Sequence, residues 1–418
     1  MFQPVRGTHD LMGDAMRTHR RVIEKSRLLA RVYGFEEIMT PLFEFSSVFH
    51  RLGLSSDIVS KETYSFTDRG GESLTLRPEG TAGVMRAVIS NGLTQSTPLR
   101  YFYHGPMFRY DRPQKGRQRQ FHHVGAELIG VNSPYGDIEV IQYAHQVLCE
   151  LDLKDKVTLE INTLGDQASR DAYRQALVTY FEGVKEKLSP ESQKRLETNP
   201  LRILDSKEAC DKEFVRETPL LKEYLTHEAQ TFFDKVCVGL MHLKIPFKCN
   251  PHLVRGLDYY CHTAFEFTTT ALGSQSTVLG GGRYDGLSQQ LGGPPLAGVG
   301  WAAGVERLCL LMEAVTNKRR PVVVIPLEDE AWPFALNVLT ILRHEHIMTM
   351  PVFTAHLSKG LKQANKMQGR AALMMGMNEV MANQVLIKDL DTGLQESISM
   401  KDLVMYIQRH FIYNVESF

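Results

Sequence analysis

Positive charge is concentrated in one short stretch, residues 109–120, which reads RYDRPQKGRQRQ. The stretch holds a single acid, Asp111, among five cations, which are Arg109, Arg112, Lys115, Arg117 and Arg119. The chain as a whole is neutral, with 48 Lys and Arg residues against 48 Asp and Glu residues. Guanidinium groups present fixed forks of donors that match phosphate and carboxylate oxygens. The stretch therefore predicts a local polyanion site, and the neutral total argues against nucleic-acid binding through an overall positive field.

Length and composition set the broad class of the protein. A chain of 418 residues suits two or three domains, and 43% hydrophobic with 23% charged residues is typical of a soluble globular protein. The six cysteines include no C-x-x-C pair, so a zinc knuckle or a redox pair is not expected. Scattered cysteines and an N-terminal segment without an apolar core predict a cytoplasmic protein, and no run of residues predicts a membrane partner.

The elements around the basic stretch follow from local pattern. Residues 14–33 have apolar positions at roughly helical spacing, and Gly34 is well placed to end that helix. The next apolar run reads as a strand that Pro41 confines to an edge, an end or a bulge. Residues 99–110 and 120–131 are two β-prone runs that flank the cations. They predict a hairpin whose long connection carries the charge.

The residue composition and the predicted elements change twice further along the chain. Residues from about 165 to 235 are charged and helix-prone, with Ser189 and Pro190 as an N-cap and first helical residue, so a helical insertion is expected. Residues 295–312 predict a strand through Val299 that turns over Gly300 into a helix at about 303–313. After residue 320, strands alternate with helices, which predicts a small, mainly parallel α/β domain.

Several separated segments together resemble one enzyme family. GFEEIMTPLFE (34–44), FRYDRPQKGRQRQFHHVGAE (108–127) and GVGWAAGVERL (298–308) resemble motifs 1, 2 and 3 of class II aminoacyl-tRNA synthetases. LVRGLDYYCHTAFEF (253–267) and GGGRYDGL (280–287) resemble the two motifs specific to the histidyl-tRNA synthetase family. The first three segments give only the class, and the last two indicate which amino acid is used.

This resemblance implies a fold and an activity. The fold is an α+β catalytic domain with the antiparallel sheet of class II synthetases over residues 1–320, including the helical insertion, and an α/β anticodon-binding domain over residues 321–418. The activity is that of a histidine–tRNA ligase, which joins histidine to ATP as histidyl-adenylate and then transfers histidine to tRNA(His). Mg²⁺ is expected to accompany ATP, with protein ligands unknown, and no zinc or organic cofactor is expected. Motif 1 implies a homodimer.

The resemblance also assigns roles to the cations. Arg109 and Arg255 are expected as the catalytic pair on opposite sides of the α-phosphate, where Arg255 takes the place of a magnesium ion used by other class II enzymes. The remaining ATP contacts are Asp111 with the adenine amino group, Phe121 stacked on adenine, and Arg117 and Arg307 with the β- and γ-phosphates. Arg112 and Gln114, in the middle of the connection, are expected to meet the acceptor end of the tRNA, whereas Lys115 there also fits a solvated loop.

The same resemblance implies a histidine pocket. Its expected members are Glu79 and Thr81 at the α-amino group, Glu127 and Tyr260 at the imidazole, and Tyr284, His123 and Arg255. His123 stands where the family usually has glutamine. Since the reference pKa of histidine is about 6.5, protonated His123 would repel the ammonium group and weaken histidine binding at mildly acidic pH. A metal site shared by His122 and His123 is disfavoured, because adjacent strand residues point to opposite faces.

One alternative reading is a relative that does not charge tRNA, the synthetase-like regulatory subunit of ATP phosphoribosyltransferase. That relative normally lacks the C-terminal domain, and its counterpart of LVRGLDYY is degraded. This chain has both features, so the resemblance favours the ligase.

Overall fold

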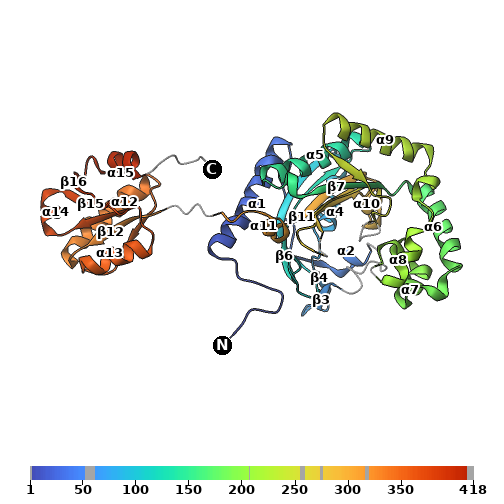
Figure 1. The fold of residues 1–418 in the computed structure, drawn as a ribbon, viewed down its shortest axis with the longest axis horizontal. Coiled ribbons are helices and arrows are strands. Elements are labelled where there is room, and N and C mark those ends of the chain that lie inside the picture. The colour runs from blue at the N-terminus through green and yellow to red at the C-terminus, as the bar shows by residue number, and fades with distance from the viewer. Residues whose placement is uncertain are drawn as a thin grey trace. The chain divides into compact units, whose positions relative to one another are not determined.

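The computed structural model describes residues 2–51, 62–206, 208–254, 259–273, 276–315 and 320–411. It forms two compact units, Met1–Val315 and Thr316–Phe418 (Figure 1). The domain boundary predicted at residue 320 lies just past this division. In the described part of the chain, no helix combines the length and the apolar character that crossing a membrane requires.

The larger unit is built on an eight-stranded sheet in the order β1-β5-β6-β11-β10-β9-β7-β8. Its inner strands pair antiparallel, while the edge strands β1 and β8 pair parallel with their neighbours. The antiparallel sheet expected for the catalytic unit is confirmed. The strands are β1 (Glu36–Glu37), β5 (Leu99–Phe108), β6 (Gln120–Ile129), β7 (Thr158–Thr163), β8 (Phe247–Cys249), β9 (Cys261–Thr268), β10 (Thr277–Arg283) and β11 (Gly298–Gly304).

Helices cover one face of this sheet and pack the main hydrophobic core. Side chains of the covering helices meet the sheet at residues such as Phe102, Val124 and Trp301. The other face carries a second core around Met85, Tyr103 and α4, beside a small antiparallel sheet in the order β2-β4-β3. The covering helices are α1 (Gly13–Val32), α5 (Pro134–Glu150), α9 (His227–His242) and α11 (Val305–Leu311). The second face has α2 (Ser46–His50), α4 (Thr81–Ser90), α10 (Leu287–Gln290), β2 (Phe43–Phe45), β3 (Tyr64–Thr67) and β4 (Ser73–Leu76).

The predicted hairpin is confirmed as β5 and β6, with a register that runs from Leu99 opposite Ile129 to Phe108 opposite Gln120. Successive side chains of a strand point to opposite faces. Val124, Ala126 and Leu128 therefore enter the helix-covered core, while the residues between them face the other side.

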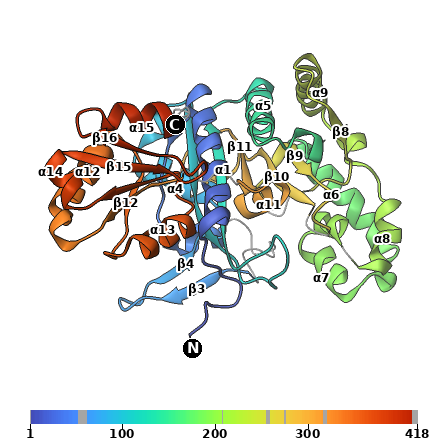
Figure 2. The same cartoon turned by 60° about the vertical axis from the view of Figure 1, so that its left-hand side comes forward.

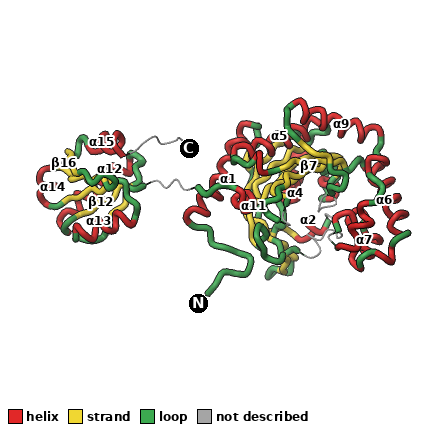
Figure 3. Tube along the Cα trace, viewed as in Figure 1, coloured by secondary structure: helices red, strands yellow, loops and turns green. Residues whose placement is uncertain are grey.

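The predicted helical insertion forms a separate cluster of helices (Figure 3) with its own small core around Tyr173, Leu177 and Phe181. Ser189 caps α7 by accepting from the Ser192 N–H, and Pro190 is the first helical residue, as predicted. Helix α9 starts inside the predicted insertion, yet it packs against α5 in the main core. The cluster comprises α6 (Gln167–Glu182), α7 (Pro190–Thr198) and α8 (Ala209–Arg216).

One local prediction is wrong. We expected the strand before motif 3 to end near Val299 and to turn at Gly300, but β11 continues to Gly304 and α11 begins at Val305. Gly300 pairs with Glu127 across the β6–β11 ladder, and this long-range pairing extends the strand through the glycine. Glycine is needed at position 300 because Glu127 on the neighbouring strand leaves no room for a side chain, and not because of a turn.

The smaller unit is a five-stranded sheet in the order β13-β12-β14-β15-β16 with four helices. Three strands pair parallel, as expected, whereas β15 and β16 pair antiparallel, and the sequence pattern did not predict β16 or α14. Its elements are β12 (Val322–Pro326), α12 (Trp332–His344), β13 (Thr349–Pro351), α13 (Leu357–Lys366), β14 (Ala371–Met375), α14 (Met377–Ala382), β15 (Gln384–Asp389), β16 (Gln395–Ser399) and α15 (Leu403–Phe411).

Candidate functional site

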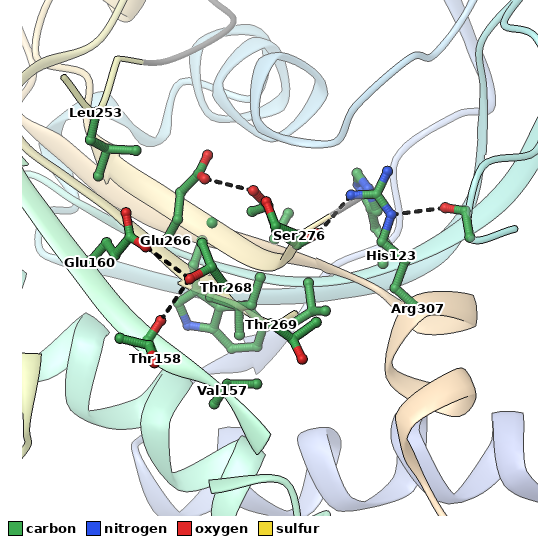
Figure 4. A pocket seen from close by; sticks show the side chains of 18 of the residues that line it. His123, Val157, Thr158, Glu160, Leu253, Glu266, Thr268, Thr269, Ser276 and Arg307 are labelled. Atoms are coloured by element: carbon green, nitrogen blue, oxygen red, sulfur yellow. Dashed lines mark hydrogen bonds between the residues drawn. The ribbon is translucent and has the colours of Figure 1, made fainter. Parts of the chain in front are cut away.

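A cavity of about 930 Å³ opens over the sheet of the larger unit, on the face opposite the main helix layer (Figure 4). Strands β6, β7, β9, β10 and β11 form its floor, and the hairpin connection and the start of α11 line one end. Of these strands, β9, β10 and β11 lie side by side in Figure 2. Most of the predicted site residues that the structure describes line it, namely Glu79, Thr81, Arg109, Asp111, Arg117, Phe121, His123, Tyr260 and Arg307.

Three predicted guanidinium groups share one end of the cavity. Arg109 and Arg117 come from the hairpin connection, and Arg307 comes from the first turn of α11. Burial, together with the positive charges of Arg109 and Arg117, lowers the pKa of Arg307 to about 10. The Arg307 side chain is held by carbonyl oxygens, with Nε 2.8 Å from Gly116 O and Nη1 2.7 Å from Thr277 O. Like charges kept this close favour a bound polyanion.

Asp111 and Arg117 pair with each other in this structure. Arg117 Nε lies 2.8 Å from Asp111 Oδ2, and Nη1 lies 3.1 Å from Oδ1. The predicted roles of these two residues, with adenine and with phosphate, therefore require the pair to open or to be shared with the ligand.

The aromatic ring of Phe121 lies beside one of these arginines, Arg109. The Arg109 guanidinium carbon lies 5.3 Å from the centroid of the Phe121 ring, a cation–π arrangement. Arg109 Nε also donates to Pro78 O at 2.9 Å, which fixes the orientation of the fork. The Phe121 ring meets the His123 ring edge to face, with centroids 5.1 Å apart. A flat, apolar ring beside fixed donors suits a nucleobase attached to phosphates.

The environment of His123 contradicts the acidic-pH hypothesis. Burial lowers the pKa of His123 well below 6.5, and nearby Arg109, Arg307 and Arg77 lower it further. The imidazole therefore stays neutral at mildly acidic pH. The reference pKa failed as a guide because the sequence alone did not reveal how many guanidinium groups gather around this ring.

A buried carboxyl group, Glu127, organises the far end of the cavity. Its side chain accepts from Thr81 Oγ1 at 2.7 Å and from the Tyr284 hydroxyl at 2.6 Å, and the residue is 1% exposed. Burial raises the pKa of Glu127 to about 8, and the neighbouring Glu79 carboxylate adds to this rise. Neither Glu127 nor Tyr284 lines the cavity surface, and Glu127 is connected to it through Thr81, which does. The structure thus brings together Glu127, Thr81 and Tyr284, which the family resemblance had placed in one pocket.

Glu79 combines two positions. It accepts from the backbone N–H groups of Thr81 at 2.6 Å and Ala82 at 2.9 Å, so it caps the N-terminus of α4. It also lines the cavity and lies close enough to Arg109 for that charge to lower its pKa, although burial raises the pKa overall. A carboxylate fixed by two backbone donors is a preorganised partner for a ligand ammonium group.

The remaining predicted residues fall into three situations. Tyr260 lines the cavity and packs against Tyr259, with ring centroids 4.7 Å apart. Arg255, the predicted partner of Arg109, lies outside the described residues. Arg112 and Gln114 are exposed in the hairpin connection, where the backbones of Gln114 and Arg117 exchange hydrogen bonds of 3.0 and 2.9 Å.

Comparison with known proteins identifies the family. A model of histidyl-tRNA synthetase matches residues 7–308, and a model of an anticodon-binding domain matches residues 321–410. The chain belongs to the histidyl-tRNA synthetase family. The histidine–tRNA ligase of Rhodospirillum rubrum is 51% identical over 410 residues, which cover 98% of this chain and 99% of that protein. The histidine–tRNA ligase of Gluconobacter oxydans is 50% identical over 403 residues, covering 96% of this chain and 97% of that protein.

A solved histidyl-tRNA synthetase supports the same assignment in three dimensions. The apo crystal structure of the S. aureus protein superposes with a TM-score of 0.82 at 33% sequence identity, covering 97% of this chain and 99% of that one. Both the catalytic architecture and the additional C-terminal sheet are therefore those of the histidyl-tRNA synthetase family.

Sequence reasoning missed two carboxylates of this family member's cavity. Glu160 on β7 and Glu266 on β9 are directly opposite each other in the antiparallel ladder, and both line the cavity. Glu160 accepts from Thr268 Oγ1 at 3.0 Å and from Asn250 Nδ2 at 2.6 Å, while Glu266 accepts from Thr277 Oγ1 at 2.6 Å (Figure 4). An acid between apolar residues of a strand, as in TLEINT, is the signal that could have revealed them.

Proposed function

We propose that this chain is a histidine–tRNA ligase that carries out both of its reactions in the cavity over the sheet of the larger unit. The observation that carries the proposal is the division of this cavity. One end gathers Arg109, Arg117 and Arg307, and the other end is lined by Glu79, Thr81 and Tyr260, with Glu127 buried behind Thr81. A ligand that fits both ends carries phosphates at one side and a small polar ring with an ammonium group at the other.

In the first reaction, the histidine carboxylate attacks the α-phosphate of ATP and pyrophosphate leaves. Arg109 is our candidate for the guanidinium between the carboxylate and the α-phosphate, because Pro78 O and the Phe121 ring fix its direction. Phe121 supplies a stacking surface for adenine. Arg117 and Arg307 would take the terminal phosphates. Preorganised donors of this kind stabilise charge that builds up in the transition state, and loss of one typically costs roughly 10²–10³ in rate.

Histidine selection would come from the buried end. The Glu127 carboxyl and the Tyr260 hydroxyl are our candidates for the two imidazole nitrogens, with Tyr284 holding Glu127 in place. Glu79, held at the start of α4, would receive the ammonium group together with Thr81. Pockets that hydrogen-bond a polar ring can reject analogues that lack it by about 10⁴–10⁵. Arg255 stays a prediction as the second arginine at the α-phosphate.

Magnesium would reach this site with ATP. Glu160 and Glu266 fit the ion, because they are paired carboxylates on one wall and Mg²⁺ prefers oxygen ligands. When bound, the ion would neutralise phosphate charge alongside the arginines. Glu160 and Glu266 would hold and orient the ion.

A homodimer is proposed from the motif 1 region. Large apolar side chains are exposed there, far more than a solvated surface needs, and a second copy of the chain would cover them. They are Leu28, Val32, Met39, Phe43 and Phe45, which are between 52% and 82% exposed. The cytoplasmic location stays a prediction from the sequence.

The acceptor end of tRNA(His) would approach the exposed middle of the hairpin connection. Arg112 and Gln114 lie there, next to the ATP-facing Asp111 and Arg117. Two polyanions would thus meet one loop in succession, ATP at its ends and tRNA at its centre. The C-terminal unit would bind the anticodon arm, in keeping with its family match.

The proposal is tested with two assays and two variants. The wild-type protein should support ATP–pyrophosphate exchange with histidine and no other amino acid, whereas a regulatory subunit would support none. Arg112→Ala should keep this exchange and slow the charging of tRNA(His), because it removes a contact to tRNA alone. Arg109→Ala should abolish both activities. Equal loss of both activities in the two variants would contradict the division of the loop.

A further inference from the structure

Three side chains of metal-ligand type meet beside the cavity, where helices α1 and α11 pack on the sheet. They are His19 on α1, His122 on β6 and Glu306 on α11, and one ligand atom of each lies within 4.8 Å of the others. The three elements contact one another in pairs (Figure 1). Strand alternation explains the meeting, because His123 faces the cavity and His122 must therefore face the helices.

The His19 side chain is buried in this cluster without a hydrogen-bonding role among the described residues. The residue is 5% exposed, and neither Nδ1 nor Nε2 has a hydrogen-bond partner among the described residues. Its ring packs edge-on against the His122 ring, with centroids 4.6 Å apart and an interplanar angle of 85°. A buried polar group without a partner is rare and calls for an explanation. Burial and the neighbouring His122 lower the pKa of His19, so the ring is neutral and offers a lone pair.

Glu306 is oriented from the strand. Its carboxylate accepts from the His122 backbone N–H at 3.1 and 2.9 Å, and Oε1 lies 2.8 Å from His122 Nδ1. Backbone donors of this kind fix a ligating carboxylate in metal sites. Zinc bonds of about 2.0–2.2 Å in a tetrahedral arrangement place ligand atoms roughly 3.3 Å apart, so side chains whose ligand atoms lie within 4.8 Å of one another would draw closer on binding the ion.

We propose that His19, His122 and Glu306 form a binding site for a divalent transition-metal ion of the Zn²⁺ type, with water as the fourth ligand. Two imidazoles and one carboxylate are a set that zinc uses when one position stays open to water. Neutral imidazole suits zinc, whereas Mg²⁺ prefers oxygen ligands, so this site differs in chemistry from an ATP-bound magnesium. His104 is not a member, because its Nε2 already lies 3.0 Å from Glu37 and 2.8 Å from Arg27.

The bound ion would join three elements that position the cavity. His122 lies between Phe121 and His123 on β6, and Glu306 directly precedes Arg307 on α11. Glu306 also lines the cavity, and a metal that links it and His122 to α1 would hold the cavity residues of both elements in position. Its effect is therefore expected in stability and metal content and not only in activity. The absence of C-x-x-C pairs argued against zinc in the sequence analysis. That argument applies only to zinc sites built from closely spaced cysteines, and the proposed site uses two histidines and a glutamate.

The test measures metal content and heat stability of the full chain. Protein treated with EDTA is dialysed against low micromolar Zn²⁺, then analysed for bound zinc and melted with and without the ion. The wild type should hold one zinc more per chain than His19→Phe, which keeps a flat ring against His122. Zn²⁺ should raise the Tm of the wild type and of His145→Phe by several degrees and leave the Tm of His19→Phe unchanged. His145→Phe is the matched control, because His145 lies 3.7 Å from the Cys149 sulfur and could bind zinc adventitiously.

Cobalt spectra identify the ligands. Co²⁺ at the proposed site should give visible absorption without a sulfur charge-transfer band, and His19→Phe should lose it. Glu306→Gln repeats the test without removing a core ring, so the result does not depend on one variant folding. Equal zinc binding by wild type, His19→Phe and Glu306→Gln would overturn the site, and so would a cobalt spectrum dominated by thiolate.

Discussion

Gly300 is the residue whose replacement should damage the histidine end of the cavity most selectively. It lies opposite Glu127 in the β6–β11 ladder. A Cβ added at Gly300 would lie 1.7 Å from Glu127 Oε2 and 2.6 Å from the Ala126 carbonyl oxygen. Both distances are far below van der Waals contact, and the second involves backbone that cannot rotate away. Gly300→Ala must therefore displace the Glu127 carboxyl group.

The size of the effect follows from the bonds that Glu127 makes. It accepts from Thr81 at 2.7 Å and from Tyr284 at 2.6 Å, both in buried surroundings. Leaving a buried polar group without its partner costs about 1–3 kcal/mol. If relaxation recovers part of the cost for the two bonds, about 2–4 kcal/mol remain. At about 1.4 kcal/mol for each factor of ten, kcat/KM for histidine should fall roughly 30- to 1000-fold.

The assay is histidine-dependent ATP–pyrophosphate exchange, with histidine and ATP varied separately. The loss should be in kcat/KM for histidine, with a much smaller change in the KM of ATP. Gly304→Ala in the same strand is the matched control, because its added Cβ would meet only Arg307 side-chain carbons at 3.6 Å, an ordinary contact. Thermal melts verify that both variants fold. A folded Gly300→Ala enzyme within threefold of wild type would refute the reasoning.

Two further predictions concern stability. Asp137→Ala removes the fully buried carboxylate that pairs with the fully buried Arg283 guanidinium and leaves it, among the described residues, only the partly exposed Asp285, 3.1 Å away. Unfolding in urea should show a loss of about 3 kcal/mol, and a loss below about 1 kcal/mol would contradict this. Burial raises the pKa of Glu127 from 4.5 to about 8, so its contribution to stability is fully present below about pH 4.5 and is lost as pH rises through 8. Glu127→Gln should avoid that loss, and its stability relative to wild type should rise steadily in urea titrations at pH 5, 6, 7 and 8, whereas a constant difference would argue against a raised pKa.

The parts of this protein that could be predicted are those with local signals. The basic connection, the flanking β-prone runs and the Ser189–Pro190 cap depend on neighbouring residues, and the structure has them where the sequence placed them. The family motifs added the grouping of Glu127, Thr81 and Tyr284, which are far apart in the sequence but joined by hydrogen bonds to Glu127 beside the cavity.

The parts that failed depend on partners from distant segments. The strand through Gly300 continues because β6 pairs with it, and no local feature of the glycine reveals that partner. Glu160 and Glu266 come together only because β7 and β9 pair in one particular register. Helix α9 packs on α5 although its composition resembles that of the insertion before it. Local pattern therefore finds elements better than their neighbours in space.

The two ends of the cavity differ in how burial acts on charge, and this bears on catalysis. Burial disfavours charge on His123 and on Glu127 alike, so the first stays neutral and the second is largely protonated near neutral pH. The arginines cannot escape in this way, because a guanidinium stays charged even when its pKa falls to about 10. The free cavity therefore concentrates positive charge at the end that holds Arg109, Arg117 and Arg307, where Asp111 pairs with Arg117. ATP binding would relieve the repulsion between these arginines, and an incoming ammonium group would then favour ionised Glu79 at the other end. Each substrate would thus stabilise the charged form of the side chains that bind it, so the charges would be neutralised within the cavity.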